Sequence, residues 1–133
     1  RAELNKKIYN NQYEMKKYKD FINPKIKEYL IRKINNTEGV IFIEWALLIE
    51  DCLYDLVDNI IMIYCEEEIQ IDRLKNGDLG KEEIIKRINL QLTNEQKLEK
   101  IKQLKKEFYV IDTSNNPKVE EYEKVLKKEG LYE

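Results

Sequence analysis

A stripe of mostly apolar positions, spaced three or four residues apart, runs along the first part of the chain and predicts an amphipathic helix near residues 2–22. The stripe consists of Leu4, Ile8, Asn11, Met15, Tyr18 and Ile22. Asn23 and Pro24 follow as an N-cap and a first helical residue, so a second helix is expected over residues 24–34. Residues 1–34 are therefore predicted to form two N-terminal amphipathic helices.

A long stretch without Gly or Pro, residues 40–71, is predicted to be one long central helix or two collinear helices. Break signals place three more helices near residues 82–92, 94–110 and 118–128, and Thr93 with Gln96 forms a capping box before the second of these. The chain has four glycines and two prolines, and 38% of its residues are charged. This balance predicts an all-α fold.

The segment 92–130 has the order of an EF-hand, in which two helices flank a twelve-residue polar loop. Counted from Asp112, the loop carries oxygen ligands at positions 1, 3, 5 and 12 and an apolar residue at position 8. The oxygen ligands are Asp112, Ser114, Asn116 and Glu123. Less complete copies begin at Lys33 and Asp72, so the pattern recurs near residues 33–44, 72–83 and 112–123.

This segment resembles the calmodulin and myosin light-chain family. The resemblance implies EF-hand-like helix-loop-helix units over residues 35–133, arranged around the long central helix. An unrelated helical bundle is the alternative fold. Each loop also has a defect for calcium: Lys33 opens the first, Leu74 occupies position 3 of the second, and Pro117 stands in the third where the backbone needs a positive φ.

No metal or other cofactor is therefore expected, and Asp112, Ser114, Asn116 and Glu123 remain as weak candidates for ion ligands. The family resemblance then implies a non-enzymatic, calcium-independent module that binds an amphipathic basic helix of a larger protein. The residues predicted to contact that helix are Phe42, Trp45, Leu48, Leu92, Phe108 and Leu126. The alternatives are a helical scaffold and a non-catalytic interaction domain similar to HEPN modules.

Charge and composition agree with a binding module. Residues 34–72 carry ten acids and no base, which favours a basic partner and disfavours nucleic acid. The chain has no histidine and no glycine-rich phosphate loop, so it is not expected to be an enzyme.

The two cysteines and the apolar run bear on the compartment. Cys52 and Cys65 stand thirteen residues apart in the predicted central helix, a rise of about 20 Å that no disulfide spans. Two free thiols predict a cytoplasmic protein. Acidic residues interrupt the apolar run between residues 40 and 65, so no membrane span is expected.

Overall fold

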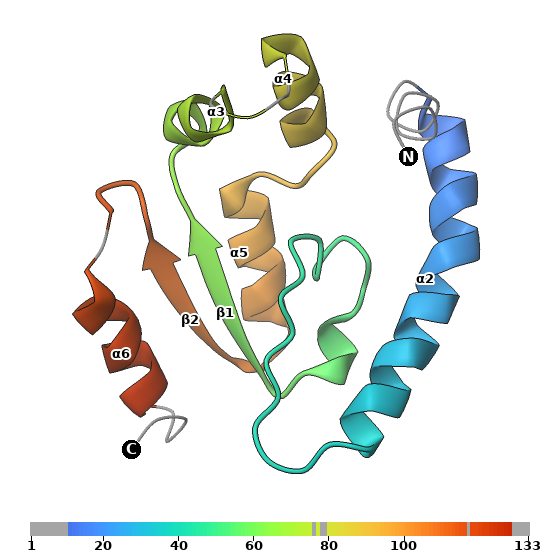
Figure 1. Ribbon diagram of the computed structural model, residues 1–133, viewed down its shortest axis with the longest axis vertical. Coiled ribbons are helices and arrows are strands. Elements are labelled where there is room, and N and C mark those ends of the chain that lie inside the picture. The colour runs from blue at the N-terminus through green and yellow to red at the C-terminus, as the bar shows by residue number, and fades with distance from the viewer. Residues whose placement is uncertain (1–10, 76, 78–79, 117, 129–133) are drawn as a thin grey trace. The chain divides into compact units, whose positions relative to one another are not determined.

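The computed structural model describes residues 11–75, 77, 80–116 and 118–128, and the chain forms two compact units, Arg1–Leu56 and Val57–Glu133. The first unit contains helix α2 (Gln12–Asn35) and a short 3₁₀ helix, η1 (Tyr54–Leu56) (Figure 1). The second unit contains, in chain order, β1 (Asn59–Tyr64), α3 (Glu67–Lys75), α4 (Lys81–Asn89), α5 (Asn94–Gln103), β2 (Glu107–Asp112) and α6 (Val119–Lys128).

Helix α2 is continuous where the sequence predicted a break. Asn11 caps it, because its side chain accepts a hydrogen bond from the Tyr13 N–H at 2.9 Å. The expected cap, Asn23, instead uses its side chain to bind Asp51, and the helix runs through Pro24 to Asn35. Residues 2–10 of the predicted first helix lie outside the described residues.

The predicted central helix over residues 40–71 is wrong. Residues 40–45 have no regular structure, turns follow, and Cys52 has a left-handed backbone with φ 54°. The Ile-rich run Asn59–Tyr64 then forms β1, in which Ile60 and Met62 are buried on one face. β-Branched side chains lose rotamer freedom in a helix and pack well in a strand, which explains the outcome.

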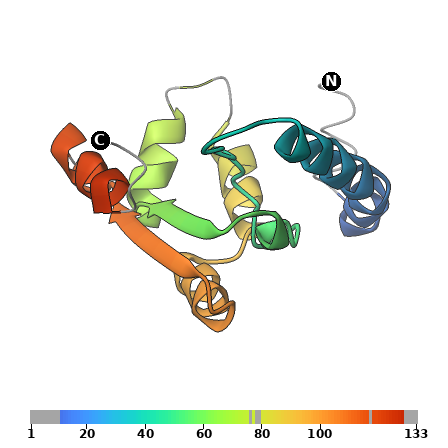
Figure 2. The same ribbon diagram turned by 90° about the horizontal axis from the view of Figure 1, so that it is seen from below.

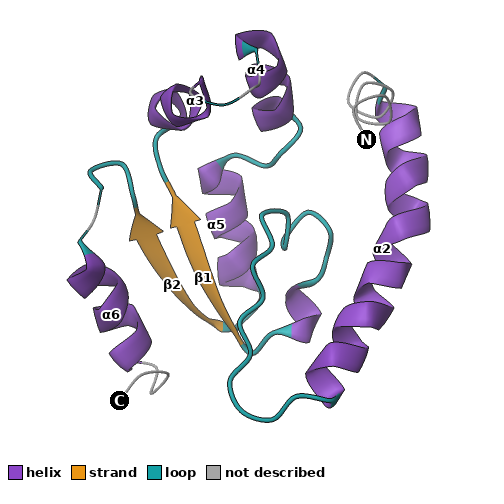
Figure 3. Cartoon of the chain, in the orientation of Figure 1, coloured by secondary structure: helices purple, strands orange, loops and turns teal. Residues whose placement is uncertain are grey.

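Strand β2 pairs with β1 in parallel, from Asn59 opposite Glu107 to Tyr64 opposite Asp112 (Figure 3). The predicted helix over 94–110 ends at Gln103, and Lys105, with φ 55°, turns the chain into β2. Because parallel strands require a long crossover, α3, α4 and α5 together form that connection. The all-α prediction and its helical-bundle alternative are therefore wrong, and the second unit is an α/β fold.

Helix α5 contacts β1, and Figure 2 shows it on one side of the two strands. The core of the second unit is apolar and includes Ile60, Met62, Ile84, Ile101 and Ile111. In the described part of the first unit, Ile49 and Leu53 are buried apolar residues.

Several local predictions are confirmed. Helices α4 and α6 lie close to the ranges expected for them. The capping box is present, since the Thr93 hydroxyl accepts from the Gln96 N–H at 3.2 Å and the Gln96 side chain accepts from the Thr93 N–H at 3.0 Å. Separately from these predictions, none of the helices in the described ranges has the length and apolar content that a membrane span needs.

Candidate functional site at the carboxyl ends of the strands

The two strands of the second unit end at the same edge, because they run in parallel and Tyr64 stands opposite Asp112. In open α/β sheets, ligands bind outside the carboxyl ends of the strands. The loops that leave this edge are residues 65–66, before α3, and the segment that begins at Thr113 (Figure 1). The polar groups gathered at this edge form the candidate site.

Thr113 continues the strand pairing by one residue. Its N–H donates to the Tyr64 carbonyl oxygen at 2.8 Å, and its hydroxyl donates to the same oxygen at 2.9 Å. The two loops are joined again by Ser114, whose hydroxyl accepts from the Glu66 N–H at 3.0 Å. These bonds fix the two loops to each other at the edge of the sheet.

The carboxylate of Asp112 organises the start of the second loop. It accepts hydrogen bonds from the Ser114 hydroxyl at 2.6 Å and from the Ser114 N–H at 2.8 Å. These two bonds lower the pKa of Asp112, and a hydrogen bond with Tyr64 adds to the effect. Loss of hydration raises the pKa of the Tyr64 hydroxyl, and the negative charge of Asp112 raises it further.

Arg73, in the last turn of α3, brings a guanidinium group to the same loop. It donates to the Thr113 hydroxyl at 3.1 Å, to the Thr113 carbonyl oxygen, and to the side-chain oxygen of Asn116 at 2.9 Å. Asn116 has a left-handed backbone, with φ 48°, which a short polar side chain tolerates. A forked cation and two hydroxyl groups thus stand together outside the strand ends.

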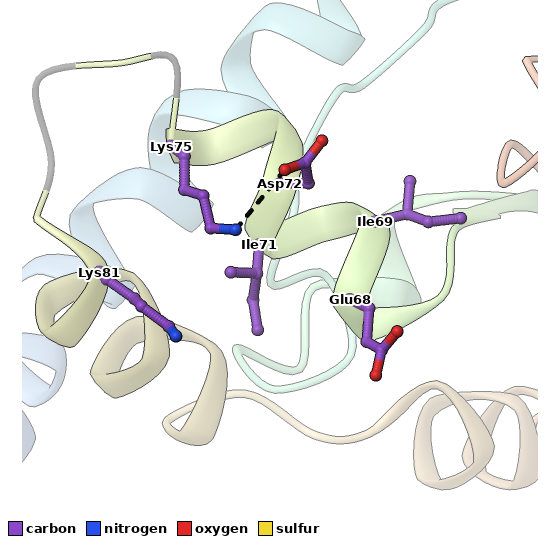
Figure 4. Close-up of a pocket in the computed structure, with 6 residues that line it drawn as sticks. All are labelled: Glu68, Ile69, Ile71, Asp72, Lys75 and Lys81. Atoms are coloured by element: carbon purple, nitrogen blue, oxygen red, sulfur yellow. Dashed lines mark ion pairs between the residues drawn. The ribbon is translucent and has the colours of Figure 1, made fainter.

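A cavity of about 510 Å³ lies between α3 and α4, which contact each other. It is lined by Glu68, Ile69, Ile71, Asp72, Lys75 and Lys81 (Figure 4). Lys75 pairs with Asp72 on its own helix at 3.5 Å, while Lys81 comes from the first position of α4. Helix α3 therefore carries both the cavity wall and Arg73, which binds the loop after β2.

The described part of the chain holds no group of three or more His, Cys, Asp or Glu side chains arranged for a metal ion. Asp112, Ser114 and Asn116, three of the weak ion-ligand candidates, do gather in the loop after β2, where they bond to each other or to Arg73. Glu123 lies on α6 and pairs with Lys127 at 3.9 Å. Pro117 is outside the described residues.

The six residues predicted to contact a partner helix are divided between the two units. In the first unit Phe42 is 63% exposed, Trp45 is half-buried and donates to Asp51, and Leu48 is half-buried. In the second unit Leu92 precedes the cap of α5, Phe108 lies in β2 and Leu126 lies on α6.

Sequence reasoning missed Arg73, Thr113, Tyr64 and Glu66. The available signal was the presence of two short runs of β-branched and aromatic residues, each followed by polar residues, which is a pattern of strands ending at a ligand edge. The EF-hand interpretation assigned the second run to a helix instead. The helix that should precede a calcium loop at Asp112 is in fact β2.

The second unit is thus an α/β fold in which an arginine and two hydroxyl groups gather outside the carboxyl ends of the strands. Comparison with known families makes this more specific. The family model of CoaE, dephospho-CoA kinase, matches residues 1–115, and the chain belongs to this family.

Curated relatives agree with this membership. The chain is 33% identical over 129 residues to a dephospho-CoA kinase of Listeria innocua, covering 93% of this chain and 60% of the relative. It is 32% identical over 102 residues to that of Clostridium perfringens, covering 73% and 51%. The chain thus spans about half to three-fifths of the length of these relatives. No solved structure matches the chain significantly.

Family membership overturns the functional predictions made from sequence. The resemblance to calmodulin and myosin light chains is wrong, and so are the light-chain-like, helical-scaffold and HEPN-like functions predicted beside it. The relatives are named as kinases, which contradicts the prediction of a non-enzyme. The prediction of a basic amphipathic helix as the partner is also wrong, because it depended on the resemblance to light chains. The misleading pattern arose because acids and hydroxyls that end a strand and begin a turn fall at the spacing of calcium ligands.

Proposed function

We propose that this chain acts in a dephospho-CoA kinase, which transfers a phosphoryl group from ATP to dephospho-CoA. The observation that carries the proposal is the match of the family model to residues 1–115. The geometry supports it, because an arginine fork and neighbouring hydroxyls suit the phosphates of a nucleotide, and they stand at the strand ends where α/β proteins bind ligands.

Within this proposal, the nucleotide binds at the cluster around Arg73 and Thr113, and we call this edge of the sheet the nucleotide edge. The sequence holds no glycine-rich loop of the GxxxxGK[ST] type. The support for nucleotide binding at this edge comes from the Arg73 guanidinium and the neighbouring hydroxyl groups of Thr113 and Ser114. In the described structure the Arg73 guanidinium is held by Thr113 and Asn116, so it is already oriented before a ligand arrives.

The test compares three variants in a nucleotide-binding titration and in an assay of ATP-dependent phosphorylation of dephospho-CoA. Arg73→Ala removes the fork, and we expect at least tenfold weaker ATP binding, about 1.4 kcal/mol. Arg73→Lys keeps the charge but loses the planar fork, so it should recover part of the affinity. Arg32→Ala is the matched control, because Arg32 pairs with Glu28 on the exposed surface of α2.

The outcomes separate the two parts of the proposal. If Arg73→Ala binds ATP as tightly as the unaltered chain, the strand-end cluster is not the nucleotide edge. If the unaltered protein phosphorylates neither dephospho-CoA nor a related nucleotide, the kinase function itself is refuted.

We also propose a cytoplasmic location. Cys52 is exposed, Cys65 is half-buried, and both are free thiols, which a reducing compartment preserves.

A further inference from the structure

Asp51 of the first unit is a charged group that the proposed kinase function does not use. Its side chain is 5% exposed, and buried carboxylates require hydrogen-bond partners. Three donors surround it: the Lys19 ammonium at 2.9 Å, the Asn23 amide at 3.3 Å and the Trp45 indole N–H at 3.0 Å. A single carboxylate therefore joins α2 to the segment that follows it.

The remaining contacts of α2 are shallow. Lys19 and Asn23 are one turn apart, so they lie on the same face of the helix. That face also carries half-buried apolar residues, namely Met15, Ile22, Ile26, Leu30 and Ile34. No described residue of this 24-residue helix is fully buried. The helix thus depends on the polar contact at Asp51 more than a helix with a deeply buried stripe would.

The segment that carries Asp51 has a structure of its own. The Leu48 N–H donates to the Trp45 carbonyl oxygen at 3.2 Å, and the Leu53 N–H donates to the Leu48 carbonyl oxygen at 3.0 Å. Ile49 and Leu53 are buried, at 6% and 2% exposed. These backbone hydrogen bonds join residues of the segment 45–53 to each other, and we call this segment the platform.

We propose that α2 opens from the platform formed by residues 45–53 as one piece, and that Asp51 is the latch that holds it closed. Opening separates the Lys19 ammonium from its buried counter-charge and uncovers the half-buried stripe of the helix. The unit then has two states, and a ligand that binds one of them better shifts the balance. This inference does not depend on the kinase function.

Hydrogen exchange and Trp45 emission measure the latch directly in the full chain. An isolated helix is only marginally stable in water, so amides of an undocked α2 lose most of their protection. Asp51→Asn removes the charge at nearly constant volume. We expect at least tenfold faster exchange in α2 and a red-shifted emission of Trp45, the single tryptophan, with unchanged exchange in β1 and β2.

Two further variants complete the test. Lys19→Met removes the cation from the helix side and should also accelerate exchange in α2. Asp20→Asn makes the same chemical change as Asp51→Asn at an exposed position of α2, and should leave both signals unchanged.

Three results would overturn the proposal. The first is unchanged exchange of α2 in Asp51→Asn. The second is equal acceleration in β1 and β2, which would mean general destabilisation. The third is an unchanged α2 in Lys19→Met, which would remove the ion pair from the latch.

Discussion

Replacement of Ile84 by alanine tests the core of the second unit. Ile84 lies on α4 and is completely buried, whereas its neighbour Ile85 on the same helix is 37% exposed. Replacement of a buried isoleucine by alanine lowers the free energy of unfolding by about 2–5 kcal/mol, because the transfer free energy of the deleted atoms is lost and a cavity remains. Small domains have about 5–15 kcal/mol of stability in total. Ile84→Ala should therefore remove a large part of the stability of this unit.

The matched control is Ile85→Ala, which deletes the same atoms one position along. Its cost should stay below about 1 kcal/mol, because part of the side chain is already in water and alanine has the higher helix propensity. Urea unfolding followed by circular dichroism measures both variants, and Trp45 emission follows the first unit separately. If the two variants differ by less than about 0.5 kcal/mol, α4 does not pack through Ile84 as described.

Other substitutions test a helix cap, a proline inside a helix and a carboxylate at the end of a strand. Thr93→Ala removes the capping box of α5 and should cost about 1 kcal/mol in the same urea experiment. Pro24→Ala restores a backbone donor inside α2 and should stabilise the first unit by about 1–3 kcal/mol, seen by Trp45 emission. The pKa of Asp112 is lower in the folded chain than in the unfolded chain. The ionised carboxylate therefore contributes to folding stability at pH values above its unfolded pKa, and this contribution is lost as the pH falls through its folded pKa. In Asp112→Asn the melting temperature should therefore fall less steeply with decreasing pH than in the unaltered chain, as measured by thermal unfolding from pH 6 down to about pH 2.5.

The features that sequence predicted well depend on neighbouring residues. The capping box from Thr93 to Gln96 requires residues three positions apart, and α4 has an apolar stripe bounded by Gly80. Such signals lie within one or two helical turns, so they need no knowledge of the rest of the fold. They are confirmed for this reason.

The strands could not be recognised in the same way. Asn59–Tyr64 is a short apolar run, and periodicity alone does not separate a buried strand from a buried helix. What makes it a strand is its pairing with Glu107–Asp112, forty-eight residues later in the chain. A helix prediction for either run is therefore reasonable locally and wrong in the fold.

Among the residues of the candidate site, those that lie close together in the sequence could be predicted, and those brought together only by the fold could not. The sequence indicates Asp112, Ser114 and Asn116 as candidates because their oxygen-bearing side chains follow one another closely along the chain. Arg73 was missed, because its partner Thr113 is forty residues away and no local pattern joins them. Tyr64 was missed for the same reason, since it meets Asp112 across the sheet.

The protein partners of these oxygens show what a cation would have to displace in the loop after β2. In a calcium loop the side-chain oxygens face a divalent cation, and few protein donors compete for them. Here the Asp112 carboxylate accepts from the N–H and hydroxyl of Ser114, and the Asn116 side chain accepts from Arg73. A cation would have to displace those donors and approach a guanidinium group, which costs Coulombic energy. The same guanidinium favours an anion, which agrees with the proposal of a nucleotide phosphate at this edge and with the expectation that the loop does not serve as a calcium site.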